Sequence, residues 1–197
     1  MVDGASVAEI RAWLERLAAG DLDLRADNCA FAHGALGLLP APASPDLPDG
    51  YLAPHFTLAE LTRSDTATAH GLDNTPPPAA LGELALLALT LEKVRALLGG
   101  HPVHISSGYR SPKLNALVGG ASQSAHMAGA AADFTVPDFG TVLECCHALA
   151  PHLRELAVDQ LIFENAAWIH LGRAPGGAAP RYQCLTISGG STVEGFP

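Results

Sequence analysis

The chain is organised around residues 106–136, which read SSGYRSPKLNALVGGASQSAHMAGAAADFTV. In this stretch His126 and Asp133 lie either side of glycine and alanine residues that are too small to cover them. A neutral imidazole and a carboxylate both bind first-row metal ions, and a catalytic site of this kind needs a third protein ligand and an open position. The later segment WIH, residues 168–170, offers His170 as that ligand. The sequence therefore predicts a metal site formed by His126, Asp133 and His170.

A structural role is the competing interpretation, because a lone histidine is more often a hydrogen-bonded part of the fold than a metal ligand. The seven positions from His126 to Asp133 would suit one side of a helix. The small residues Gly129 and Ala130 instead favour a loop that enters a strand, where the backbone allows close approach. Two histidines and one aspartate that converge on strand ends favour the metal site.

The composition is that of a globular protein. Hydrophobic residues make up 48% of the 197 residues and charged residues only 16%, which excludes a disordered polyelectrolyte and a small disulfide scaffold. This length is enough for one sizeable core. The four cysteines have no CxxC spacing, and the adjacent Cys145 and Cys146 would point in different directions on a helix. We therefore expect buried apolar cysteines rather than a zinc knuckle or a disulfide framework.

The chain is acidic, with a net charge of −9 from 11 basic and 20 acidic residues and no run of lysine or arginine. This charge argues against nucleic acid or an anionic membrane as a partner. No uncharged apolar run reaches about 18 residues, so we expect no membrane span. The first residues lack a basic start followed by an apolar core, so we expect no signal peptide. The protein is therefore expected to be made in the cytosol. We also expect a monomer.

The N-terminal residues predict a small extension to the main domain. Apolar residues recur at helical spacing over residues 6–19, between Ser6, which can cap the helix, and Gly20. Periodicity is then lost, and the prolines of residues 40–48 predict a stiff connector that ends near Gly50. We therefore expect a helix and connector in residues 1–50 and the main domain in residues 51–197.

The main domain predicts an α+β fold with a small antiparallel sheet and flanking helices. Its most strongly periodic helix covers residues 80–98 and ends before Gly99 and Gly100. Other helices are expected near residues 58–61, followed by a polar loop, and at 112–118 and 139–153. Strands are expected at residues 103–106, 130–136, 159–164, 168–171 and 181–187, the third and fourth forming a hairpin and the fifth an edge strand.

Several motifs in a fixed order resemble a known family. Ser124-x-His126-x-x-Gly129-x-Ala131-x-Asp133 is preceded by SGYRS at 107–111 and followed by W-x-H at 168–170. This pattern resembles the zinc D-alanyl-D-alanine carboxypeptidases and peptidoglycan endopeptidases, a family that includes phage endolysins and the dipeptidases of vancomycin resistance. The similarity extends from about residue 55 to about 182, and FTLAELTRSDTA, GLDNTPP, SQSAH and DQLIFE resemble its phage-type branch.

The resemblance implies a fold related to the Hedgehog signalling domain and a role for each matching residue. His126, Asp133 and His170 match the zinc ligands. Arg110, in the SGYRS turn, matches an arginine that holds the substrate carboxylate or the peptide oxygen, a task that suits its planar fork of donors. Ser124 is expected to donate to the substrate or to orient a ligand. Gln160 is expected to contact the substrate, to fix strand geometry or to contact the ligand loop.

Glu164 is the residue predicted to act as the general base, which takes a proton from water and passes it to the leaving amine. It ends one strand of the expected hairpin while His170 lies in the other strand, so both return to the same region. Some branches carry the acidic base three residues before the last histidine, where this chain has Ala167. Glu164 lies six positions before His170, as in the phage-type branch. The alternative is a surface carboxylate at a strand end.

The resemblance implies a zinc-dependent hydrolase that cleaves a peptide bond in peptidoglycan stem peptides. It would be a D,D-carboxypeptidase or endopeptidase, endolysin-like, and would act on the cell wall after release from the cytosol. The first alternative is a catalytically silent binding module that holds zinc on the same fold, which Ala167 in place of an acid keeps open. The second is a peptidase with another substrate, such as a cytosolic dipeptide.

Overall fold

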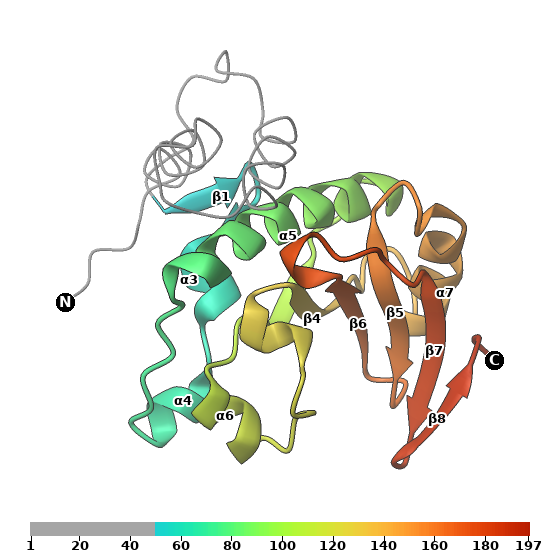
Figure 1. Cartoon of the computed structure of the whole chain (residues 1–197). Coiled ribbons are helices and arrows are strands. Elements are labelled where there is room, and N and C mark those ends of the chain that lie inside the picture. The colour runs from blue at the N-terminus through green and yellow to red at the C-terminus, as the bar shows by residue number, and fades with distance from the viewer. Residues whose placement is uncertain (1–49) are drawn as a thin grey trace.

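The computed structural model describes residues 50–197, so the predicted helix at 6–19 and the proline-rich connector lie outside the described residues. Two sheets and several helices make up the described chain (Figure 1). The smaller sheet pairs β1 (Tyr51–Ala53) with β2 (Phe56–Thr57), antiparallel. Both strands contact the long helix α5 (Pro78–Leu97).

The larger sheet has six strands in the order β3-β4-β6-β5-β7-β8. Their bounds are β3 His104–Ser107, β4 Ala131–Thr135, β5 Val158–Glu164, β6 Trp168–Arg173, β7 Gln183–Ser188 and β8 Ser191–Glu194. Neighbouring strands are antiparallel except β5 and β7, which run parallel because the segment 174–182 crosses over at the end where β5 begins. The fold is α+β as predicted, but its larger sheet is mixed rather than purely antiparallel.

Alternation along the strands divides the larger sheet into an apolar face and a face that carries the site. Phe134, Leu161, Ile169 and Leu171 are completely buried and join side chains of α5 and α7 (Val142–Leu149) in the hydrophobic core. The residues next to them in each strand point to the opposite face. Burial of the apolar face therefore fixes which side chains are presented on the other face of the sheet.

The long helices begin and end where local sequence signals predict. Pro78 lies in the first turn of α5, where its missing amide hydrogen breaks no helical bond, and Gly99 and Gly100 follow the helix. Thr141 and Glu144 form a capping box at the start of α7, each satisfying a backbone amide of the other. The shorter helices are α3 (Leu58–Thr62), α4 (Asp65–Ala69), α6 (Pro112–Leu117) and the 3₁₀ turns η1 (Ala125–Ala128), η2 (Ala150–His152) and η3 (Pro175–Gly177).

Three elements differ from their predictions. The supposed polar loop after α3 contains α4, because the Ser64 hydroxyl accepts the Ala67 amide at the start of that helix. The predicted edge strand at 181–187 is β7, which is internal because β8 pairs with its outer side. The helix predicted at 139–153 begins only after the Thr141 cap, and its last turn continues as η2 around Pro151.

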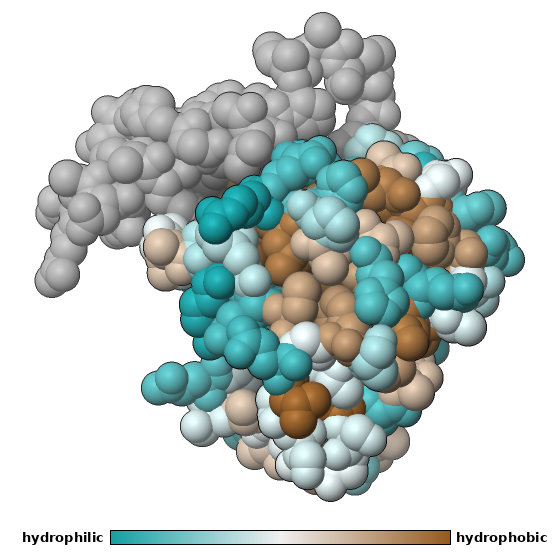
Figure 2. Space-filling model, turned by 90° about the vertical axis from the view of Figure 1, so that its right-hand side faces the viewer, coloured by the Kyte–Doolittle hydropathy of each residue, from teal (hydrophilic) through white to brown (hydrophobic). Residues whose placement is uncertain are grey.

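The large apolar side chains exposed on the described residues are scattered, namely Leu117, Val118, Phe139 and Val193. Figure 2 shows the face that contains β7 and β8, where apolar residues are interrupted by hydrophilic ones. No helix in residues 50–197 is long and apolar enough to cross a membrane.

Three of the four cysteines lie in the described residues, and all three are free thiols. Cys145 and Cys146 are fully buried in α7, and burial raises the pKa of Cys146 to about 12. Cys184 is half-buried in β7. The prediction of buried apolar cysteines is confirmed for Cys145 and Cys146, while Cys29 lies outside the described residues.

Candidate metal centre

His126 is held by η1, a short turn between α6 and β4. The Ser124 hydroxyl accepts the His126 amide at 3.4 Å at the start of this turn, and Gly129 ends it with a left-handed φ of 77°. The ring Nδ1 donates to the carbonyl oxygen of Gly108 at 2.7 Å. Because this bond uses the Nδ1 proton, the neutral ring presents an unprotonated Nε2 to the site.

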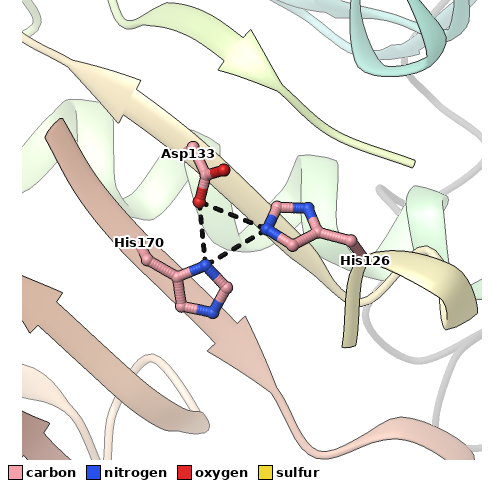
Figure 3. Close-up of side chains that lie close together, drawn as sticks. All are labelled: His126, Asp133 and His170. Atoms are coloured by element: carbon pink, nitrogen blue, oxygen red, sulfur yellow. Dashed lines mark hydrogen bonds and ion pairs between the residues drawn. The ribbon is translucent and has the colours of Figure 1, made fainter. Parts of the chain in front are cut away.

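Asp133 and His170 meet across the β4–β6 ladder. They are direct partners in the antiparallel register, so their side chains leave the sheet on the same face. His170 Nδ1 lies 2.8 Å from Asp133 Oδ1, and His126 Nε2 lies 3.2 Å from each of these two atoms. Figure 3 shows the three side chains pointing toward one another from η1, β4 and β6. The structure thus brings together all three predicted metal ligands.

The geometry and chemistry of these three atoms fit a zinc ion. Zinc bound tetrahedrally by nitrogen and oxygen at about 2.0–2.1 Å separates its ligand atoms by about 3.3 Å, close to the distances observed. Within residues 50–197, His126, Asp133 and His170 are the one group of His, Cys, Asp or Glu side chains that could hold a metal ion. His126 Nε2 and Asp133 Oδ1 are both hydrogen-bond acceptors, so a shared cation would relieve their mutual repulsion.

Burial and neighbouring groups favour the metal-binding protonation states of His126 and Asp133. His126 is 2% exposed, and burial lowers the pKa of its imidazole, which favours the neutral ring. Burial alone would raise the pKa of Asp133, but the adjacent rings of His126 and His170 lower it well below its ordinary value. The site therefore offers two imidazoles and one carboxylate, a ligand set that leaves zinc a net positive charge.

Arg110 lies beside the ligands and contacts one of them. Its Nη2 donates to Asp133 Oδ2 at 2.5 Å, its Nε donates to Ser107 Oγ at 2.8 Å, and its backbone amide donates to the His126 carbonyl. Its side chain remains 18% exposed and lines the cleft above the site. Arg110 thus orients Asp133 in this structure, and its contact with substrate stays a prediction.

The three ligands lie in a cleft of about 910 Å³. Glu164 lines the same cleft and pairs with Trp168 across β5 and β6, while Ile162 pairs with His170. Glu164 and His170 are therefore diagonal neighbours on one face, with Cα atoms about 7–8 Å apart. No side-chain hydrogen bond of Glu164 occurs within residues 50–197, so its carboxylate is available to the cleft. Its role as a base stays a prediction.

Ser124 and Gln160 both line the cleft. Ser124 caps the turn that carries His126, and Gln160 Nε2 donates to Gln183 Oε1 at 3.1 Å, which ties β5 to β7. Both residues therefore support the geometry of the site. Their contact with substrate stays a prediction.

Several residues that line or support the cleft were assigned no role from the sequence. The Gly108 carbonyl fixes the tautomer of His126, but only tertiary structure brings residue 108 to residue 126. Trp168 lies next to Glu164 in the ladder, and its indole N–H has no partner among the described residues. Apolar side chains of β5 and β7 form the floor, and period-two alternation could have identified them: Ile162, Leu185 and Ile187.

An ion pair between Asp159 and Arg181 lines the cleft. Arg181 Nε and Nη2 and its backbone amide all donate to the carboxylate of Asp159, so the segment after β6 is tied to β5. This pair also escaped the sequence analysis, because its members lie 22 residues apart and belong to no motif. It fixes the crossover that makes β7 parallel to β5.

Comparison with known proteins agrees with this geometry. Part of the chain is similar to the zinc D-Ala-D-Ala carboxypeptidase of Streptomyces albus G, with 35% identity over 79 residues. The match covers 40% of this chain and 30% of that protein, so the chain spans about a third of the length of the relative it matches. The family described as peptidase M15 matches residues 54–172, which contain all three candidate ligands, Arg110 and Glu164. The chain therefore belongs to the peptidase M15 family.

Proposed function

We propose that the protein is a zinc-dependent peptidase that cleaves a peptide bond in peptidoglycan stem peptides, as a carboxypeptidase or an endopeptidase. The observation that carries this proposal is the convergence of His126, Asp133 and His170 within 3.2 Å of one another in a cleft that Arg110 and Glu164 also line. Membership of a peptidase family supports the reaction class. The name of the Streptomyces relative supports zinc and the D-Ala-D-Ala class of substrate.

Zinc held by the three ligands would supply a Lewis acid that polarises the scissile carbonyl and makes an attacking water more acidic. Glu164 accepts a proton from the water while the water oxygen attacks the carbonyl carbon. The same carboxyl group then donates this proton to the leaving nitrogen as the carbon–nitrogen bond breaks. Each turnover therefore consumes one water, and Glu164 returns to its ionised state.

Arg110 is proposed to serve both the ligand and the substrate. Its Nη2 holds Asp133 Oδ2, and the guanidinium has further donors that can reach an oxygen in the cleft. Within residues 50–197, no other arginine or lysine is bonded to a candidate ligand. Arg110 is therefore the cation placed to meet a substrate carboxylate or the developing oxyanion beside the ligands. The guanidinium of Arg110 is therefore suited to an anionic group of the substrate close to the ligands.

The test is digestion of purified peptidoglycan fragments by the zinc-loaded protein, followed by mass spectrometry. Wild type should release a product of defined mass, and Glu164→Gln should lose at least about 100-fold in rate, within the usual range for a general base. Glu164→Gln should still bind one zinc ion. A variant that keeps wild-type turnover would remove Glu164 from the mechanism.

A catalytically silent zinc-binding module is the second candidate, and Ala167 at the position of the acid in other branches favours it. This candidate predicts bound zinc but no product from any fragment. We also propose that the protein acts on the cell wall after release from the cytosol. Detection of cleaved stem peptides in the wall of cells that express it, and not of cells that express Glu164→Gln, tests that location.

A further inference from the structure

A second cleft adjoins the first at Arg110. It has a volume of about 740 Å³ and shares Arg110 and Val118 with the cleft that holds the ligands. Helix α4 and the residues before it form one wall and β3 the other: Glu60, Arg63, Ser64, Asp65, Thr66 on one side and residues 103–107 on the other. The proposed mechanism does not use this second cleft.

The outer edge of β3 faces the second cleft. Five consecutive residues, 103–107, line it, although side chains in a strand alternate between two faces. A cavity that contacts successive residues in this way lies along the main chain. β3 is the terminal strand of the larger sheet and pairs only with β4 among the described strands. Within residues 50–197, no backbone group of this outer edge has a hydrogen-bond partner.

A bulge connects this edge to the metal site. The β3–β4 register shifts between Ile105 and Ser107, and the hydroxyl of the intervening Ser106 donates to the backbone carbonyl of Asp133 at 3.1 Å. Bulges of this kind are common at sheet edges beside active sites. A chain paired with the outer edge of β3 would therefore be separated from β4 and its candidate ligand Asp133 by β3 alone.

We propose that the second cleft binds an extended segment of the peptide substrate, which pairs with the outer edge of β3 as an added strand. Main-chain hydrogen bonds to a sheet edge are a recurrent way of binding extended peptides. The proposal rests on the proposed peptidase function and narrows its substrate to peptides that reach well beyond the scissile bond. A free dipeptide could not occupy both clefts.

Strand spacing sets the length that the substrate needs. Two steps of about 4.8 Å separate β4 from a strand added beyond β3, about 10 Å in all. An extended chain crosses this distance in about three residues. On the side of the scissile bond that enters the second cleft, substrate residues beyond the third should therefore increase the affinity of the peptide for the protein.

The first experiment compares synthetic stem peptides that share one scissile bond and carry arms of one to six residues on the amino or the carboxyl side. The value of kcat/KM should rise at least about tenfold between arms of two and five residues on one side only, as two net hydrogen bonds would give. N-methylation of successive amides in the long arm should lower kcat/KM at alternate positions, because every second amide of a strand faces its partner. Equal values for short and long arms would overturn the inference and leave the peptidase intact.

The second experiment fills the cleft from the protein side. Thr66→Trp places a bulky side chain in the second cleft, and Thr68→Trp is the matched control, since Thr68 is exposed on the same helix and does not line it. Thr66→Trp should reduce kcat/KM for the long peptide to the short-peptide value and leave the short peptide unaffected. Thr68→Trp should change neither value of kcat/KM. If Thr66→Trp lowered kcat/KM equally for the long and the short peptide, the inference would be contradicted.

Binding separates failure of the inference from failure of the peptidase function. Fluorescence anisotropy of labelled long and short stem peptides can be measured with zinc-loaded Glu164→Gln. If wild type cleaves no fragment, the proposed peptidase function fails. Tighter binding of the long peptide that Thr66→Trp abolishes and Thr68→Trp does not would still show that the second cleft binds an extended peptide. Binding that is independent of arm length and of Thr66→Trp would reject it.

Discussion

His126 depends on its surroundings for the state in which it binds metal. Its Nδ1 proton is committed to the Gly108 carbonyl, and burial lowers the pKa of the ring, so Nε2 carries the free lone pair at neutral pH. Asp133 has one carboxylate oxygen toward the histidines and the other toward Arg110. His126 and Asp133 are thus each oriented by a partner that does not itself bind the metal, an arrangement typical of zinc sites.

Removal of a ligand should abolish tight zinc binding. His126→Ala and His170→Ala should each weaken zinc affinity by more than about 100-fold. The reason is that loss of a residue that only hydrogen-bonds to a metal ligand already lowers metal affinity by about 10–100-fold. His152→Ala is the matched control, since the His152 ring bonds to Glu155 and lies outside the cleft. Zinc competition with a chromogenic chelator gives the affinities. Wild-type affinity in His170→Ala would exclude the proposed ligand set.

At the residue scale the sequence predicted the three candidate ligands that the structure brings together, but not their partners. His126, Asp133 and His170 could be identified because the order of motifs fixes their places in the chain. The bond from His126 to Gly108 and the bond from Arg110 to Asp133 depend on how β3, η1 and β4 pack, which no local pattern encodes.

Turn η1 ends at a position that only glycine fits. Gly129 has a φ of 77°, and a Cβ there would lie 2.6 Å from the carbonyl oxygen of Ala80 in α5. An alanine would therefore be strained and would also push η1, with His126, away from α5. The geometry of the turn thus links helix packing to the candidate metal ligand.

Gly129→Ala should lower both stability and zinc affinity. The left-handed conformation costs about 1 kcal/mol for alanine, and the contact with Ala80 adds about 1–3 kcal/mol, as overpacking does. Gly119→Ala is the matched control, since Gly119 has a φ of 74° with nothing within 4 Å of its Cβ position. Thermal unfolding should show a loss for Gly129→Ala that is at least twice that of Gly119→Ala. Equal losses would show that the contact with α5 carries no energy.

The Asp159–Arg181 pair should make stability depend on pH. Hydrogen bonds from Arg181 lower the pKa of Asp159 below its ordinary value of 3.8. A carboxyl group with a lowered folded-state pKa stabilises the fold above 3.8, and this contribution is lost as the pH falls through the folded-state pKa. Asp159→Asn should therefore cost about 1 kcal/mol at pH 7, as expected for a partly exposed bidentate pair.

The measurement is urea unfolding of wild type and Asp159→Asn at several pH values. The difference in free energy of unfolding should be constant from pH 7 to about pH 5 and should shrink below pH 3.8. Asp138→Asn, which changes an exposed carboxylate that forms no ion pair among the described residues, should show no such difference. A difference that grows as the pH falls would contradict the assigned sign.

At the element scale, strong periodicity and caps were sufficient for α5, α7 and the β5–β6 hairpin. The short helix α4 was missed because five residues carry no period, and only the Ser64 cap marks it. The internal position of β7 was missed because strand order depends on the crossover at 174–182 and on its Asp159–Arg181 bond.

Across residues 50–197, the two faces of the larger sheet separate the hydrophobic core from the candidate site. Helices α5 and α7 pack with the apolar face, and the ligands, Arg110 and Glu164 meet at the opposite side. The α+β class could be predicted from the mixture of elements, whereas the mixed sheet and the second cleft arise from long-range pairing. The two clefts meet at Arg110, so ligand orientation and the proposed substrate contact depend on the same residue.

Zinc-dependent peptide hydrolysis at this site is the central claim, and titration of zinc into the metal-free protein tests it most directly. Bound zinc and the rate of cleavage of a stem peptide are followed together on the same samples. Cleavage should be absent without metal, rise in proportion to zinc bound and stop rising at one zinc per chain, and His170→Ala should show neither binding nor cleavage. Cleavage by protein proven free of metal, or one bound zinc with no cleavage of any stem peptide, would contradict the account.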